Sequence, residues 1–143
     1  MQLPSSYVVG STLQVGRVYK FSAPELLETD VPHYFVVIAI IDQDNYALVS
    51  TTQLHKRIAF LTSRGIDVDT LCHIEPTDDN GLTKDSYLDC NKYFSLPNAY
   101  LEEKVSSGFF EVSGTISDED FEKIRYSISV SDLFDIPIDY IVK

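Results

Sequence analysis

The sequence predicts one domain, residues 1–143, of mainly β structure with helices, in the α+β class. The length of 143 residues is close to the commonest size of a single domain. A hydrophobic fraction of 44% with 6 Gly and 6 Pro is typical of a globular protein. Several short strand-like segments follow one another without regular βαβ alternation, which favours a small barrel or half-barrel over a doubly wound sheet.

The clearest strand patterns lie in the first half of the chain. Residues 16–21 alternate like a half-buried strand, whereas residues 34–41 form a β-branched and aromatic run that is typical of a strand buried on both faces. Residues 42–45 predict a turn, and residues 46–50 predict its hairpin partner. The polar residues 22–33 predict a surface loop with one helical turn. Further strands are expected at residues 70–74, 86–90 and 109–112.

A short helix is predicted after the hairpin. Leu54, Ile58 and Leu61 fall at i, i+4 and i+7, so they share one face of a helix. Thr51 or Thr52 is positioned to cap its start, and a glycine at position 65 is positioned to end it. We expect this helix to lie on the sheet.

A second amphipathic helix is predicted near the C-terminus. The Ser117 hydroxyl can cap its free backbone N–H groups, and the three carboxylates at 118–120 sit at the positive end of its macrodipole. Its buried stripe is expected to consist of Phe121, Ile124 and Ile128.

The formal net charge of −11 is unevenly distributed. Residues 1–66 carry five basic and five acidic side chains, whereas residues 67–143 carry six basic and seventeen acidic ones. Nucleic acids bind surfaces that are locally positive. Any RNA site is therefore expected in the first half of the chain.

The sequence predicts a cytoplasmic protein without a membrane partner. The longest apolar run is much shorter than the roughly 20 residues of a spanning helix, and Met1 to Ser6 lack the basic and apolar regions of a signal peptide. Cys72 and Cys90 are too few for a disulfide framework and have no ligand-spaced histidine, so we expect two buried thiols. No metal or other cofactor is predicted.

Five short blocks between residues 16 and 131 together resemble the PemK/MazF family of toxin ribonucleases. The blocks are Gly16-Arg17-Val18-Tyr19, His33-Tyr34-Phe35-Val36-Val37-Ile38, Val49-Ser50-Thr51-Thr52, Lys84-Asp85-Ser86-Tyr87-Leu88-Asp89 and Gly114-Thr115-Ile116-Ser117. The resemblance implies a small SH3-like β-barrel, here with an inserted short helix and a C-terminal helix. It also implies a toxin-type endoribonuclease that cleaves single-stranded RNA without metal, acts as a homodimer and is held by an antitoxin protein.

The family usually opens its buried strand with Arg-Pro, where the arginine serves the scissile phosphate, and this chain has His33-Tyr34 there. Metal-independent cleavage needs a group that moves protons and groups that carry the phosphate charge. Our candidate catalytic residues are His33, Thr51, Thr52 and Lys56, and our candidate substrate-binding residues are Arg17 and Arg57. Apart from Arg17, each also has a plain structural interpretation, as a surface histidine, a helix cap or a solvated cation.

A non-catalytic protein-binding module on the same barrel is the alternative prediction, because an acidic second half suits protein partners better than RNA. Four aromatic residues bear on this choice, since they could stack bases, anchor a protein interface or fill the core: Tyr87, Tyr93, Phe94 and Tyr100. His55 and His73 are interpreted as structural. Residues 78–81 predict a turn rather than a calcium loop.

Overall fold

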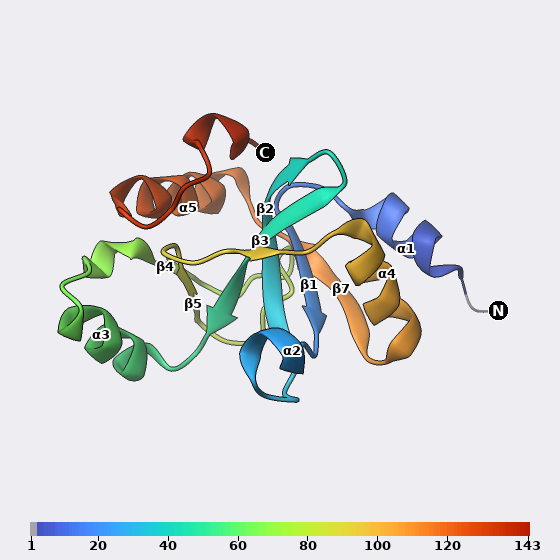
Figure 1. The fold of residues 1–143 in the computed structure, drawn as a ribbon, viewed down its shortest axis with the longest axis horizontal. Coiled ribbons are helices and arrows are strands. Elements are labelled where there is room, and N and C mark those ends of the chain that lie inside the picture. Colours follow the sequence, from blue (N-terminus) through green and yellow to red (C-terminus); the bar gives the residue numbers. More distant parts are fainter. Residues whose placement is uncertain (1–2) are drawn as a thin grey trace.

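The computed structural model describes residues 3–143, so the first two residues of the N-terminal segment discussed above lie outside it. The described chain forms a seven-stranded antiparallel sheet with five α-helices (Figure 1). The strands are β1 (Arg17–Phe21), β2 (His33–Ile41), β3 (Asp44–Thr51), β4 (Leu71–Ile74), β5 (Ser86–Asp89), β6 (Phe94–Ser95) and β7 (Phe110–Thr115). The helices are α1 (Ser5–Thr12), α2 (Pro24–Leu27), α3 (Leu54–Ser63), α4 (Asn98–Ser107) and α5 (Asp118–Val130), with short 3-10 helices η1 (Val68–Thr70) and η2 (Ile138–Tyr140).

The strand order is β4-β5-β3-β2-β1-β7, and β6 also pairs with β3. Strand β3 has different neighbours along its length, because Tyr46 and Ala47 pair with β6 whereas Ser50 and Thr51 pair with β5. Strands β4 and β7 end the order and are not paired with each other within the described residues. The α+β class is thus confirmed, but the sheet is open and the closed SH3-like barrel is not confirmed.

Strand β2 is buried on both faces, as its apolar run predicts. Val36 and Ile38 point into one hydrophobic core, and Phe35 and Val37 point into a second core on the other face. Burying a side chain of this size contributes about 1.5–3 kcal/mol. The two cores make β2 the centre of the molecule.

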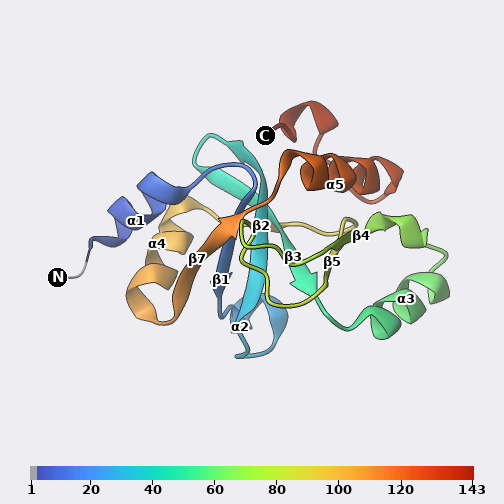
Figure 2. The same cartoon turned by 180° about the vertical axis from the view of Figure 1, so that it is seen from behind.

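Helix α5 covers the first core (Figure 2). The Ser117 hydroxyl accepts a hydrogen bond from the backbone N–H of Asp120 at 3.1 Å, which confirms the predicted cap. Phe121, Ile124 and Ile128 are buried against the sheet, which confirms the predicted stripe.

Helices α1 and α4 lie side by side over the second core and were not predicted (Figures 1 and 2). Each buries one residue completely, Val9 in α1 and Leu101 in α4. Because the apolar face of each helix is so narrow, neither segment shows the hydrophobic periodicity by which an amphipathic helix is predicted from sequence.

Helix α3 has the predicted extent, but its packing differs from the prediction. It packs mainly against η1 at the side of the molecule rather than on the sheet, and only Leu61 is buried (Figure 1). The prediction of a threonine cap is wrong, because the N-cap residue is Gln53 and makes no side-chain cap bond. Gly65 follows the helix with φ +70°, which confirms its role at the end.

The turn at residues 77–81 docks against β7. The buried Asn80 side chain accepts hydrogen bonds from the backbone N–H groups of Thr77 at 3.0 Å and Leu82 at 2.9 Å. Gly81 has φ +70°, and a Cβ atom there would lie 2.0 Å from the carbonyl oxygen of Ser113. Only glycine fits this contact, which confirms a structural turn.

Across residues 3–143, the structure has no helix with both the length and the apolar character needed to cross a bilayer. Cys72 and Cys90 are both free and buried, as predicted. Burial raises the pKa of the Cys72 thiol to about 11 and raises that of Cys90 as well. Both thiols therefore stay protonated and unreactive near neutral pH.

Candidate functional site

A cleft of about 490 Å³ opens at the end of the sheet where β2 begins and β3 ends. Strand β1, the loop before β2, the start of α3 and residues 83–86 complete its walls. We call it the cationic cleft. Its ionisable side chains are Lys20, His33, Arg57 and Lys84, and its hydroxyl-bearing side chains are Thr29, Tyr34, Ser50, Thr51, Thr52, Thr83 and Ser86.

The charge of the cationic cleft is opposite to that of the whole protein. Three of the eleven Lys and Arg residues line it, while no Asp or Glu among residues 3–143 does. Low-dielectric walls strengthen the field of such a group of charges. The cleft is therefore suited to an anionic ligand, and its hydroxyl groups can donate to anionic oxygens.

His33 begins β2 and lies at the mouth of the β2–β3 hairpin. The ladder pairs Phe35 with Val49, and two residues further along each strand are His33 and Thr51, which both line the cleft. The Nδ1 atom of His33 lies 2.8 Å from the Val31 carbonyl oxygen. A carbonyl only accepts, so Nδ1 carries a proton and Nε2 of the neutral ring is a free base.

The two predicted threonines stand on the opposite side of the cleft from β1. The Thr51 Oγ1 accepts a hydrogen bond from the backbone N–H of Gln53 at 3.1 Å, and this contact leaves the Thr51 hydroxyl hydrogen available to a ligand. Thr52 is exposed and lines both this cleft and a neighbouring depression. Both residues can donate to a bound oxyanion.

The cations reach the cleft from separate elements. Lys20 on β1 is paired in register with Tyr34 on β2, and its ammonium lies 4.8 Å from the centre of the Tyr34 ring. Arg57 comes from α3 and lies 3.4 Å from the Asp89 carboxylate, which holds it at the rim. Lys84 is exposed and belongs to the segment that precedes β5.

Lys56 lies next to the cationic cleft rather than in it. It lines a second depression of about 650 Å³, which shares Thr52 and Lys84 with the cleft. Tyr87 lines the same depression, and the His73 ring stacks on Tyr87 with 4.9 Å between centroids. The two hollows form one surface that carries four cations and one carboxylate, that of Asp85 in the second depression.

Arg17, predicted as a substrate-binding residue, does not line the cationic cleft. It lies at the opposite end of β1 from Phe21, which is the partner of His33 in the ladder. Its guanidinium donates to the carbonyl oxygens of Thr12 at 2.6 Å and Gly114 at 3.2 Å. These bonds tie α1 and β7 to β1, so the residue is structural.

Three residues of the cleft were not predicted as site residues: Lys20, Tyr34 and Lys84. Lys20 has the outward position of its strand, where a lysine is ordinary and carries no functional signal. Lys84 reaches the cleft only because β5 pairs with the end of β3. No local pattern reveals that pairing.

Three of the four discussed aromatics pack within the structure instead of lining the cleft. The Tyr93 hydroxyl donates to Asp135 at 2.6 Å, and this bond raises the pKa of Tyr93 to about 12. Phe94 and Tyr100 pack against the second core. Of the four, Tyr87 alone faces a hollow that adjoins the cationic cleft.

No set of three or more His, Cys, Asp or Glu side chains arranged to hold a metal ion occurs in residues 3–143. No protein-family model matches the sequence, and no curated protein sequence matches it.

Proposed function

We propose that the cationic cleft binds the phosphate backbone of single-stranded RNA and that the protein is a metal-independent endoribonuclease of the toxin type. One observation supports the proposal above all others. The protein has a net charge of −11, yet its cleft is lined by three cations and a histidine, and none of the Asp and Glu residues within 3–143 lines it. A divergent SH3-like fold of the PemK/MazF type is part of the proposal. So are a cytoplasmic location, a homodimer and control by an antitoxin protein.

Each chemical task has a candidate group in the cleft. The Nε2 atom of His33 takes the proton from the ribose 2′-hydroxyl, whose oxygen attacks phosphorus. The bond to the 5′-oxygen then breaks, giving a 2′,3′-cyclic phosphate and a 5′-hydroxyl. The Lys84 ammonium can supply the proton for that leaving oxygen. Thr51 and Thr52 donate to the non-bridging oxygens, where charge develops.

The second depression extends the proposed RNA site beyond one phosphate. Lys56 and Lys84 line it and suit a neighbouring phosphate, while Tyr87 provides an aromatic surface for a base. The His73 ring stacks on Tyr87 and bonds to Asp85 through Nε2 at 3.0 Å, which fixes the orientation of the stack. Alternating cations and aromatic rings are typical of single-strand binding surfaces.

The test is incubation of a long, unstructured RNA with purified protein in EDTA, with analysis of product ends. We expect cyclic-phosphate and 5′-hydroxyl ends, and loss of cleavage in His33→Ala. Lys92→Ala is the matched control, because Lys92 lies over Phe94 outside both hollows. Products with 3′-hydroxyl ends would contradict the mechanism.

A non-catalytic protein-binding module is the second candidate function. The observation that favours it is the opening of β2, where His33 replaces the expected arginine and the one guanidinium of the cleft, on Arg57, is already paired with Asp89. Intact RNA in the presence of excess folded protein would support this function over the ribonuclease.

A further inference from the structure

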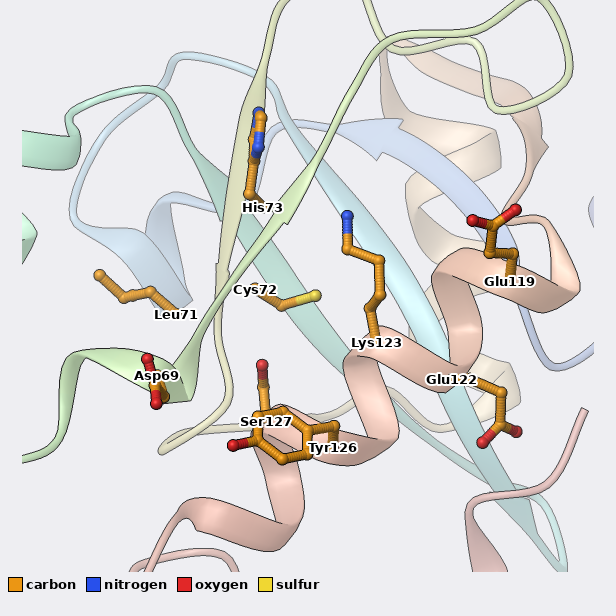
Figure 3. Close-up of a pocket in the computed structure, with 9 residues that line it drawn as sticks. All are labelled: Asp69, Leu71, Cys72, His73, Glu119, Glu122, Lys123, Tyr126 and Ser127. Atoms are coloured by element: carbon orange, nitrogen blue, oxygen red, sulfur yellow. The ribbon is translucent and has the colours of Figure 1, made fainter.

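A third hollow, of about 490 Å³, lies between strand β4 and helix α5, away from the cationic cleft (Figure 3). We call it the β4–α5 groove. One wall is the strand, with Leu71, Cys72 and His73, and the other wall is the helix, with Lys123, Tyr126 and Ser127.

Strand β4 is an edge of the sheet and is open on one side. Residue pairs in an antiparallel ladder alternate between bonded and non-bonded. The Cys90 N–H bonds to the Thr70 carbonyl at 2.9 Å, so the backbone groups of Cys72 and Ile74 also point toward β5. The backbone groups of Leu71 and His73 point away from it. The Leu71 N–H donates to Val68 within η1.

Three backbone groups therefore remain available along the groove: the Leu71 carbonyl and the N–H and carbonyl of His73. None of them has a hydrogen-bond partner within residues 3–143. A row of unpaired groups at a sheet edge is a template for another strand. The structure thus presents an edge that can take a peptide by strand addition.

The groove beside this edge has room for side chains. Its floor is formed by small side chains, because Cys72 is buried at 3% exposure and lies beside the Ser127 side chain (Figure 3). Tyr126 stands on the helix wall and is 60% exposed. An exposed tyrosine beside a groove floor of small side chains is a typical anchor for a peptide side chain.

The rim of the groove is acidic. Asp69, Glu119 and Glu122 line it, against one cation, Lys123. The Lys123 ammonium forms an ion pair with the Asp120 carboxylate at 3.7 Å, so its charge is partly compensated. Glu122 has a partner, Arg125, at 3.6 Å, whereas Asp69 and Glu119 have no ion-pair partner in the part of the chain that the structure describes. The uncompensated charge is negative.

We propose that the β4–α5 groove binds an extended basic segment of a protein partner, which adds to β4 as a further strand. Backbone bonds to Leu71 and His73 hold the segment, Tyr126 packs on an apolar side chain, and Asp69 and Glu119 attract its Lys or Arg residues. The acidic rim disfavours RNA here, and a second copy of the chain would bring two acidic rims together. The groove thus has a different ligand from the proposed ribonuclease site, although His73 lines the groove and stacks on Tyr87 of the second depression.

The probe for this proposal is an acetylated, amidated octapeptide of alternating Lys and Val, with a Glu/Val octapeptide as control. In NMR titrations of the full chain, we expect amide shifts at residues 71–74 and 123–127 with the basic peptide alone. Asp69→Asn combined with Glu119→Gln should weaken binding about 3–10-fold. Equal binding of both peptides, or shifts confined to other surfaces, would overturn the proposal.

Strand addition is tested by removing one backbone donor. His73→Pro deletes an N–H that points away from β5, so the β4–β5 ladder is kept, and His73→Ala is the matched control that retains the N–H. We expect the proline variant to bind the basic peptide about 2–10-fold more weakly than the alanine variant. If the proline variant does not fold, hydrogen exchange of the His73 amide in the wild-type protein is measured instead. Slower exchange when the peptide is bound supports strand addition, and unchanged exchange refutes it.

Discussion

The Nδ1 atom of His33 lies 2.8 Å from the carbonyl oxygen of Val31. This hydrogen bond is made within the loop that leads into β2, so the ring is oriented by its own chain and not by a ligand. With Nδ1 as the donor of this bond, Nε2 is the ring nitrogen that can act as a general base.

The first prediction separates this orientation from the proton transfer. His33→Asn retains a side-chain N–H close to the Nδ1 position but has no Nε2. We expect its free energy of unfolding to stay within about 0.5 kcal/mol of wild type. RNA cleavage should fall by at least about 100-fold. Urea unfolding and a cleavage assay measure the two effects, and full activity in this variant would exclude His33 as the base.

The second prediction concerns phosphate binding. Lys84→Ala should weaken the affinity for single-stranded RNA and reduce the slope of log affinity against log salt by about 0.7, the value for one lost phosphate contact. Lys92→Ala, outside both hollows, should leave that slope unchanged. Fluorescence anisotropy at several salt concentrations measures both variants. Equal slopes in the two variants would place the RNA elsewhere.

The third prediction tests the contact between the 77–81 turn and β7. Gly81 and Gly65 both have φ +70°, but a Cβ atom at Gly81 would meet Ser113 whereas one at Gly65 has open space around it. Gly65→Ala should cost about 1–2 kcal/mol of stability, which is the penalty for the left-handed backbone. Gly81→Ala should cost clearly more, because the turn must move away from the strand. Thermal unfolding of the pair measures the difference, and similar losses would show that the turn is not held against β7.

The fourth prediction is a pH effect at α2. The Lys104 ammonium, 2.7 Å from Glu25, and the Tyr100 hydroxyl, which donates to it, lower the pKa of Glu25 to about 2. A carboxyl whose pKa is lowered by folding stabilises the native state above its unfolded pKa of about 4.3. That contribution should be lost as the pH falls from about 4.3 toward 2.

Glu25→Gln isolates this contribution. Because Glu25 is half exposed, we expect the variant to lose only about 1 kcal/mol or less at pH 7. The difference in stability between wild type and variant should shrink as the pH is lowered. Denaturant unfolding at several pH values measures it, and a difference that is constant with pH would show that the ion pair is not formed in solution.

The order of strands along the chain was predictable because it depends on local apolar patterns. The buried run of β2, its hairpin with β3 and the capped helix α5 all follow from such patterns. Helices α1 and α4 were not predictable, because each fully buries only one side chain. Their other attachments are to parts of the chain distant in sequence, such as the Lys104–Glu25 ion pair of α4. The two-residue strand β6 exists only through its pairing with β3.

The candidate site was predictable where it follows from the hairpin. His33 and Thr51 meet because one opens β2 and the other ends β3. Arg17 was a candidate that the structure places outside the cleft, because sequence does not show which end of β1 faces it. Lys84 joins the site through a pairing between β3 and β5 across the α3 segment, which has no local signal.

The absence of carboxylates from the cationic cleft, described above for residues 3–143, has a consequence for how a polyanion reaches it. With a net charge of −11, most of the protein repels RNA, so productive encounters are limited to one approach direction. Added salt weakens the attraction at the cleft but also relieves the repulsion elsewhere. Association should accordingly depend less on ionic strength than it does for basic nucleic-acid-binding proteins, and the protein should not accumulate on RNA that it does not engage at the cleft.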